Sequence, residues 1–297
     1  MRAAFLGLGR MGRPMAVHLA GRAATLTVWN RTRAKADAFA AQVAGDVRVA
    51  ASPAEAAAGA DVVVSMVADD AAAERVHLGP DGTLAADPAP SVVVESGTVA
   101  PRTVERIAAA AAARGIGFVD APVSGSVDAA TNASLVLLVG GAENVVARAR
   151  PALDALGRSV VHLGGPGRGA LAKLLVNGVL FSLNQAVAEA MALADAGGLD
   201  VPAFYGALAD SAAGAPMLGY RRAQYLDPDA PLTFTVELAA KDMDLLAAEA
   251  QRAGTPAAQA RLVLDELRAA IDDGHGGDDM AALAWRARAA ARNGRKP

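Results

Sequence analysis

The chain has 297 residues, which is enough for two domains or for one large domain. Apolar residues make up 53% of the chain and charged residues 20%, and this composition excludes extended disorder. The formal net charge of −3 gives no electrostatic support to a nucleic-acid partner. The absence of cysteine excludes disulfides, thiolate chemistry and cysteine-ligated metals, and it fits a reducing compartment.

The N-terminal apolar run Met1–Leu6 is too short for a signal peptide and leads directly into a glycine motif. No segment approaches the ~20 uninterrupted apolar residues of a membrane span. We therefore expect a cytoplasmic protein with neither a membrane nor a nucleic acid as its partner.

The first half of the chain alternates short β-branched runs with alanine-rich amphipathic segments. The predicted strands are Ala3–Leu8, Thr25–Trp29, Asp61–Met66, Ser91–Glu95, Gly117–Val119, Ser134–Val139 and Val160–Leu163. The predicted helices between them include Pro14–Gly21, Arg33–Gln42, Pro101–Arg114 and Glu143–Leu156. Nearly continuous apolar strands separated by helices predict a doubly wound, mostly parallel sheet covered on both faces.

The pattern changes at the glycine-rich segment Gly164–Gly169, after which only helical periodicity is found. The predicted helices are Ala170–Ala196, Pro202–Asp210, Thr235–Ala253, Ala257–Asp272 and Asp278–Ala291, the first ending at Gly197 and Gly198. The fold class is therefore α/β, with an α/β domain over residues 1–164 followed by an all-helical domain over residues 165–297.

A G-x-G-x-x-G motif follows the first predicted strand and opens the first helix. Its residues are Gly7, Leu8, Gly9, Arg10, Met11 and Gly12. An ordinary glycine-rich turn is the alternative, but the strand and the helix are the context that dinucleotide binding requires. The first glycine permits the tight turn, the second lets the backbone approach a pyrophosphate, and the third allows close helix packing. The helix N-terminus then offers N–H groups to the phosphates, and we expect a Rossmann domain.

The end of the second strand indicates which dinucleotide is bound. NAD-binding proteins place a carboxylate there to hold the ribose 2′-hydroxyl. This chain has Asn30, Arg31 and Thr32 instead, with Arg33 and Lys35 just beyond. Because arginine makes bidentate bonds to phosphate, we expect NADP (NADPH) rather than NAD. The alternative is that Arg31 is only a solvated residue at a helix start.

Three further segments complete a recognisable set: Asp120–Gly125, Gly167–Asn177, and Lys241 followed by Asp242. Together with the glycine motif they resemble, in order and spacing, the β-hydroxyacid dehydrogenase family. That family includes 3-hydroxyisobutyrate dehydrogenases, tartronate semialdehyde reductases and glyoxylate/succinic semialdehyde reductases. The resemblance covers nearly the whole chain. It implies hydride transfer between a nicotinamide and a small β-hydroxy acid or semialdehyde.

Such a reaction needs a group that takes the hydroxyl proton, or returns it in the reverse direction. Lys173 lies at the start of the long predicted helix, so we expect it to face the cleft between the domains. A lysine partly desolvated there would have a lowered pKa and act as acid or base. Asn177 lies four residues later on the same helix face. A solvated helix face is the alternative for an isolated pair, but the resemblance implies that these are the catalytic lysine and the neighbouring active-site asparagine, both in contact with substrate.

The resemblance also implies roles for two loops. Ser124 and Gly125 would hold the substrate carboxylate through a hydroxyl and a backbone N–H, the alternative being a turn without a ligand. Thr98, followed by Pro101, matches the family's loop near the nicotinamide ribose, with Gly97 in place of a serine.

Other matching positions are assigned less directly. A segment that borders the cofactor comprises Met66, Val67 and Ala68. Lys241 matches the family's lysine at the cofactor or substrate end of the cleft, and Phe234 is either an aromatic of the site or a core residue. Asp120 is expected to cap a turn, and Glu189 to pair with backbone or a cation.

Several positions depart from the family's pattern and leave the substrate open. Ser126, Ala129 and Ala133 stand where glycine is common, and Gly178 replaces an asparagine. The four histidines do not cluster with carboxylates at ligand spacing, so no metal site is expected.

Two competing functions remain open at this point. An imine reductase has a similar fold and cofactor site, but generally lacks a lysine at the position of Lys173. A protein that binds NADPH without catalysis is the second alternative, whereas a 6-phosphogluconate dehydrogenase would need a longer helical domain. Apolar faces on the predicted helices, together with the resemblance, suggest a homodimer or homotetramer.

Overall fold

The structure is a computed structural model that describes residues 1–293, so the last four residues of the expected helical domain lie outside it. The contacts divide the chain into two compact units, Met1–Lys173 and Leu174–Pro297. Each unit has its own hydrophobic core.

The first unit contains a six-stranded, fully parallel sheet in the order β3-β2-β1-β4-β5-β6. The strands are β1 (Arg2–Leu6), β2 (Thr25–Trp29), β3 (Val47–Val49), β4 (Val62–Ser65), β5 (Val92–Glu95) and β6 (Gly117–Asp120). This order reverses between β1 and β4. In open α/β sheets ligands bind outside the carboxyl ends of the strands at such a reversal. The predicted Rossmann architecture is confirmed.

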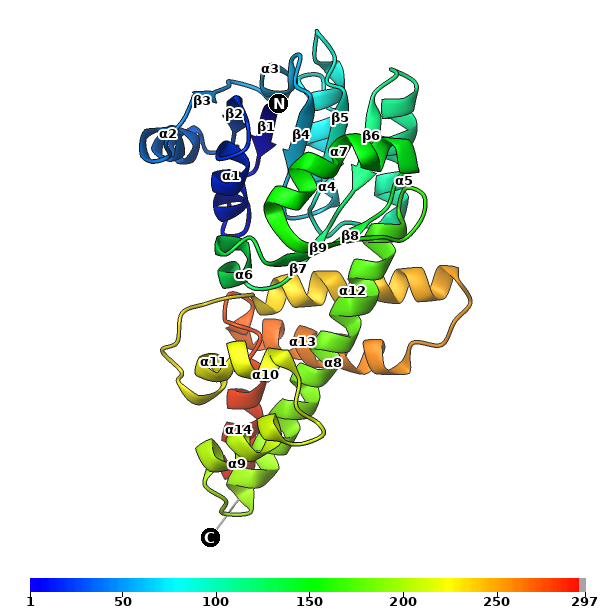
Figure 1. The fold of residues 1–297 in the computed structure, drawn as a ribbon. Coiled ribbons are helices and arrows are strands. Elements are labelled where there is room, and N and C mark those ends of the chain that lie inside the picture. The colour runs from blue at the N-terminus through cyan, green and yellow to red at the C-terminus, as the bar shows by residue number, and fades with distance from the viewer. Residues whose placement is uncertain (294–297) are drawn as a thin grey trace. The chain divides into compact units, whose positions relative to one another are not determined.

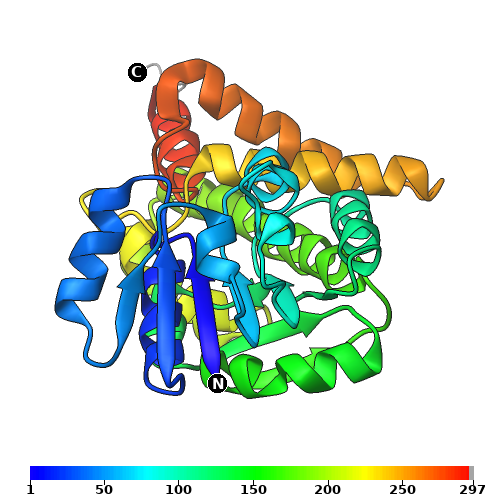
Figure 2. The same ribbon diagram turned by 90° about the horizontal axis from the view of Figure 1, so that it is seen from above.

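Helices cover both faces of this sheet (Figure 1 and Figure 2). One face carries α1 (Gly12–Ala20), α2 (Arg33–Gln42) and α7 (Glu143–Leu156), and the other carries α3 (Pro53–Ala57), α4 (Asp70–Leu78) and α5 (Pro101–Ala112). Side chains of β1 alternate between the two cores: Phe5 packs with the first set of helices, while Ala4 and Leu6 pack with the second. A strand buried on both faces favours apolar residues, which explains the apolar run Ala3–Leu6 that follows the exposed Arg2.

A second, three-stranded sheet consists of β7 (Val123–Ser124), β8 (Leu135–Val139) and β9 (Gly157–His162). β7 pairs antiparallel with β8, and β8 pairs parallel with β9. The last two strands predicted from the sequence therefore lie in a separate sheet rather than in the Rossmann sheet. The short helix α6 (Val127–Thr131) connects β7 and β8.

Among its described residues, the second unit consists of helices joined by loops, with no strand. Its elements are α8 (Arg168–Ala196, which begins in the first unit), α9 (Val201–Asp210), α10 (Pro216–Tyr220), α11 (Arg222–Leu226), α12 (Val236–Arg252), α13 (Ala258–Ala270), a π turn (Ile271–His275) and α14 (Ala282–Asn293). The long helix ends where predicted, and Gly198 has a φ of +79°, the left-handed conformation that glycine accepts at helix ends.

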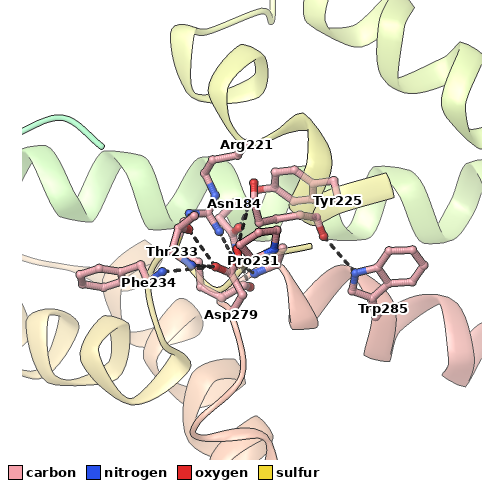
Figure 3. Close-up of polar contacts among 11 residues, drawn as sticks. Asn184, Arg221, Tyr225, Pro231, Thr233, Phe234, Asp279 and Trp285 are labelled. Carbon is pink, nitrogen blue, oxygen red and sulfur yellow. Dashed lines mark hydrogen bonds and ion pairs between the residues drawn. The ribbon is translucent and has the colours of Figure 1, made fainter. Parts of the chain in front are cut away.

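An ion pair between buried Arg221 and partly buried Asp279 organises the loop that leads into α12 (Figure 3). The guanidinium of Arg221 donates to Asp279 and to Thr233 Oγ1, the latter at 2.7 Å. The Asp279 carboxylate also accepts the backbone N–H groups of Thr233 at 2.8 Å, Phe234 at 3.2 Å and Ala281 at 3.0 Å. One carboxylate therefore joins the chain before α12 to the chain before α14.

A second set of polar contacts ties α8 to the same region. Asn184 of α8 accepts a hydrogen bond from the Tyr225 hydroxyl at 2.5 Å and donates to the carbonyl of Met280 at 3.1 Å. Trp285 donates to the carbonyl of Gln224 at 3.1 Å. Because these groups are largely buried, each missing partner would carry a desolvation cost.

Helix α8 is, among the described residues, the one helix long and apolar enough to cross a membrane by length and composition. It also carries Lys173, Asn177 and Asn184, and its residues Phe181 and Met191 belong to the buried core. A core helix meets the same criterion, so this helix is no evidence for a membrane span.

Replacement of Asp279 by asparagine should lower the free energy of unfolding at pH 7 by about 3 kcal/mol, because it leaves Arg221 buried without its counter-charge. Burial opposes ionisation of Asp279, but Arg221 and the N–H groups of Ala281 and Thr233 outweigh it and hold its pKa below the ordinary 3.8. The stabilisation is therefore complete above pH 3.8 and is lost as the pH falls through the lowered pKa.

Denaturant unfolding of both proteins between pH 7 and pH 2 measures this, and the difference between them should shrink at the acid end. The matched control is Asp244→Asn, which breaks an exposed ion pair with Arg268 and should cost less than about 1 kcal/mol. A difference for Asp279→Asn that does not depend on pH would contradict the ion-pair explanation.

Candidate active site

The glycine motif forms the turn between β1 and α1, and its three glycines have different surroundings. Gly7 has a φ of +96°, and a Cβ there would collide with the carbonyl oxygen of Met66. A Cβ on Gly12 would collide with the carbonyl oxygen of Gly7. At Gly9 a Cβ would meet nothing within 4 Å. The fold therefore requires Gly7 and Gly12, whereas Gly9 leaves an open space at the start of α1 that fits a pyrophosphate.

Asn30 links the glycine motif to the end of β2. Its Oδ1 accepts the backbone N–H of Leu8 at 3.0 Å, and its Nδ2 donates to the carbonyl of Thr32 at 2.9 Å. This side chain therefore positions the glycine loop against the end of β2. Arg31 and Thr32 are exposed, and the Thr32 side chain makes no capping bond to α2.

Beside the glycine loop lies a cavity of about 450 Å³. It is lined by Leu8, Gly9, Arg10, Arg13, Ala34, Lys35 and Ala38. Three of these residues carry positive charge, which suits the phosphates of a dinucleotide. Arg13 also donates to Gln42 at 2.5 Å and lies over the ring of Phe39.

Two segments leave the carboxyl ends of the neighbouring strands β4 and β5. The first contains Met66, Val67 and Ala68, and the second contains Ser96, Gly97 and Thr98. A Cβ on Gly97 would lie 2.5 Å from the carbonyl oxygen of Val67, so the two backbones touch at this point. The buried Ser96 Oγ has no hydrogen-bond partner among the described residues, which fits a site completed by a polar ligand.

Ser124 and Gly125 end β7 and begin the turn to α6. Ser124 is half-buried, and Gly125 has a φ of +145°, with Ala129 and Leu135 occupying the space of a Cβ. Ser126 accepts the N–H of Ala129 at 3.3 Å and so caps α6. Its hydroxyl therefore has a local structural role in addition to any effect on a nearby ligand.

Asp120, expected from the sequence to cap a turn, caps the start of α8. Its carboxylate accepts the N–H groups of Gly167 at 3.0 Å and Ala170 at 2.8 Å. The side chain is buried, and this burial raises the pKa of Asp120 although the backbone N–H groups act in the opposite direction. The cap determines the residue at which α8 begins.

Lys173 and Asn177 are one turn apart on α8 and share a face of that helix. Lys173 is half-buried. Asn177 is buried and donates from Nδ2 to Asp242 of α12 at 2.6 Å. The other carboxylate oxygen of Asp242 forms an ion pair with Lys241 at 2.8 Å. A fully buried aspartate thus joins two of the predicted site residues. From the sequence, Asp242 was noted only as the residue that follows Lys241, with no role of its own.

Two other expectations are resolved by packing. Phe234 stacks on Phe181 with ring centroids 5.7 Å apart, and both belong to the helical core. Glu189 was expected to pair with backbone or a cation, and among the described residues it accepts a hydrogen bond from the side chain of Gln185 at 2.9 Å.

Two family models together match most of the chain. Residues 2–164 match the family model described as the NAD binding domain of 6-phosphogluconate dehydrogenase. Residues 167–286 match the one described as NAD-binding of NADP-dependent 3-hydroxyisobutyrate dehydrogenase.

Individual relatives align over nearly their whole length. A 3-hydroxyisobutyrate dehydrogenase of Pseudomonas aeruginosa is 36% identical over 94% of this chain and 96% of its own. An NAD-dependent L-serine dehydrogenase of the same organism is 33% identical over 94% and 95%. The solved structure of the Mycobacterium tuberculosis 3-hydroxyisobutyrate dehydrogenase with L-serine is 30% identical, with a TM-score of 0.83 over 97% of this chain and 99% of that one.

The Rossmann sheet, the open glycine loop and these matches define an oxidoreductase that uses a nicotinamide cofactor. Within that class, the chain belongs to the β-hydroxyacid dehydrogenase family.

Replacement of Ala133 by glycine should stabilise the protein by about 1 kcal/mol. Ala133 has a φ of +49°, a left-handed conformation that costs a residue with a Cβ but not glycine. The matched control is Ala129→Gly, four residues earlier within α6, where glycine should instead cost about 1 kcal/mol. Thermal denaturation of both variants checks the opposite signs, and a loss of stability in Ala133→Gly would refute the strain.

Proposed function

We propose that the protein is an NADP(H)-dependent oxidoreductase that transfers a hydride between the nicotinamide and a small β-hydroxy acid or semialdehyde. Lys173 is the general acid/base. The observation that carries the proposal is the position of Lys173 and Asn177 one turn apart on one face of α8, a helix whose first turn is held by Asp120.

Under this proposal the chain's own residues manage the proton and the substrate. Lys173 accepts the hydroxyl proton during oxidation and returns it during reduction. Asn177 is held by Asp242 and donates its second amide hydrogen to the substrate oxygen. Ser124 Oγ and the N–H of Gly125 bind the carboxylate. The bound nicotinamide supplies the hydride chemistry.

The cofactor is held by four segments in this proposal. They are Gly7–Gly12, Asn30–Thr32, Met66–Ala68 and the loop that carries Thr98. The exposed Arg31, with no carboxylate beside it at the end of β2, supports NADP over NAD because a guanidinium binds a 2′-phosphate bidentately. Lys241 forms an ion pair with Asp242. Under this proposal Lys241 also binds an anionic group of the cofactor or substrate.

The domain roles, assembly and location are part of the same proposal. Residues 1–164 bind the cofactor, and residues 165–297 serve substrate binding and self-association in the cytoplasm. Three apolar side chains of α8, Leu175, Val179 and Leu193, are between 53% and 75% exposed in the single chain. Their exposure supports a homodimer or homotetramer, which light scattering on the purified protein tests.

Lys173→Ala should reduce kcat by about 10²-fold to 10⁴-fold, because the proton then lacks its acceptor. The Kd for NADPH should stay nearly unchanged, since the substituted side chain handles only the proton. Lys173→Arg is the matched variant: it keeps the positive charge but does not deprotonate, so it should be equally inactive. Steady-state kinetics and NADPH fluorescence titration measure both effects, and an active Lys173→Ala enzyme would refute the mechanism.

The same assay separates the alternatives. Small hydroxy acids, semialdehydes and cyclic imines are offered with NADP(H) to the wild-type protein. Turnover of imines alone would make it an imine reductase, and cofactor binding without any turnover would favour a non-catalytic module.

Arg31→Ala should weaken NADPH binding about tenfold and leave NADH binding unchanged, because the 2′-phosphate loses a charge-assisted contact. The control is Arg33→Ala, two residues further along. Arg33 pairs with Asp37 at 3.6 Å, so its loss should affect neither cofactor. Fluorescence titration of the wild type and both variants with each cofactor measures the six dissociation constants. A wild-type preference for NADH would overturn the assignment of NADP.

A further inference from the structure

Four fully buried polar side chains form a cluster beneath the two segments that leave β4 and β5. Ser65 ends β4, His77 lies on α4, Thr83 lies on the 3₁₀ turn Thr83–Ala85, and Glu95 ends β5. We refer to them as the Glu95 cluster. None of them was assigned a role above.

The contacts of the cluster converge on the Glu95 carboxylate. Its Oε2 lies 2.9 Å from His77 Nε2 and accepts from the Ser65 hydroxyl at 2.6 Å. Its Oε1 accepts the backbone N–H of Gly97 at 2.5 Å. The other ring nitrogen of His77 lies 2.8 Å from the Thr83 hydroxyl. With a neutral ring, Nε2–H donates to Glu95 and Nδ1 accepts from Thr83, and Nε2 also lies 3.0 Å from the Ser65 hydroxyl oxygen.

A buried carboxylate is stable only when donors surround it. His77 and Ser65 hold one oxygen of Glu95, which leaves the other free to bind Gly97. If His77 were replaced by an apolar residue, Oε2 would keep only the Ser65 hydroxyl, which also lies 3.1 Å from the carbonyl of Val94. The Glu95 side chain would then be free to turn away from Gly97.

The cluster is continuous with the proposed cofactor segments. Ser65 directly precedes Met66, and Gly97 directly precedes Thr98. A Cβ on Gly97 would lie 2.5 Å from Val67 O and 2.6 Å from Glu95 Oε1. The two segments therefore meet where the carboxylate holds the Gly97 N–H, and only glycine allows this approach.

We propose that His77 and Glu95 are positioning residues for the nicotinamide half of the cofactor site. They hold the Gly97 backbone against Val67 and thereby set the position of Thr98, without contact to cofactor or substrate. The inference rests on the proposed function, in which Thr98 and the Met66–Ala68 segment border the nicotinamide ribose.

The experiment compares substitutions of His77 with a neighbouring core substitution. His77→Leu removes the donor to Glu95 at similar volume. His77→Gln offers an amide nitrogen in the place of Nε2 and should restore the bond. The matched control is Val76→Ala, which removes apolar packing from the preceding residue of α4 and touches no polar group of the cluster.

Two ligands distinguish a specific effect on the nicotinamide half of the site from a general loss of stability. NADPH contains the nicotinamide, and 2′-phospho-ADP-ribose lacks it. His77→Leu should raise the Kd for NADPH about tenfold, because the contacts of the Thr98 loop with the nicotinamide half are misplaced. It should leave the Kd for 2′-phospho-ADP-ribose unchanged. His77→Gln should return the NADPH Kd to within roughly threefold of wild type. Val76→Ala should lower the Tm and change neither Kd.

Equal weakening of both ligands in His77→Leu, or a lowered Tm with an unchanged NADPH Kd, would overturn the inference while leaving the proposed function intact. If wild-type protein bound neither NADPH nor NADH, the proposed function would fail and the inference with it. Should His77→Leu not fold, Ser65→Ala removes a single donor to Glu95. It should weaken NADPH selectively, and an unchanged NADPH Kd would again overturn the inference.

Discussion

The carboxylate of Asp120 lies at the end of β6 and accepts the N–H groups of Gly167 and Ala170 at the start of α8. The first N–H groups of a helix have no partners within it, and a carboxylate there satisfies them and interacts favourably with the helix dipole. α8 runs without interruption from Arg168 to Ala196 with 3.6 residues per turn. Because Asp120 fixes the first turn, it also fixes the directions in which Lys173 and Asn177 point from the helix axis. The proposed chemistry thus depends on a residue that takes no part in it.

The elements that the sequence predicted well are long or strongly apolar. β1, β4 and β5 are buried and mostly apolar, apart from the exposed Arg2 of β1 and the buried Ser65 and Glu95 that end β4 and β5, and α8 and α12 are long helices. β3 and β7 have three and two residues, too few to show any alternation. The assignment of β8 and β9 to a second sheet depends on pairing between distant strands, which periodicity does not encode.

The candidate site also has parts that could be predicted from the sequence and parts that could not. The glycine loop was predictable because its function depends on residues adjacent in sequence. Contacts between distant side chains were not: Asn177 and Asp242 are 65 residues apart, and His77 and Glu95 are 18 apart. Asn30 illustrates the difference, since the sequence suggested a ligand for phosphate and the structure adds a bond to Leu8 that no spacing rule contains.

The division of the chain into compact units falls between Lys173 and Leu174, inside a continuous helix rather than in a linker. Many two-domain enzymes can exchange modules because a flexible segment separates them. Here a cut at that boundary would separate Lys173 from Asn177 and would break hydrogen bonds of α8 itself. The two halves are consequently poor candidates for recombination with other domains, and a chimaera would have to inherit α8 whole, together with Asp120.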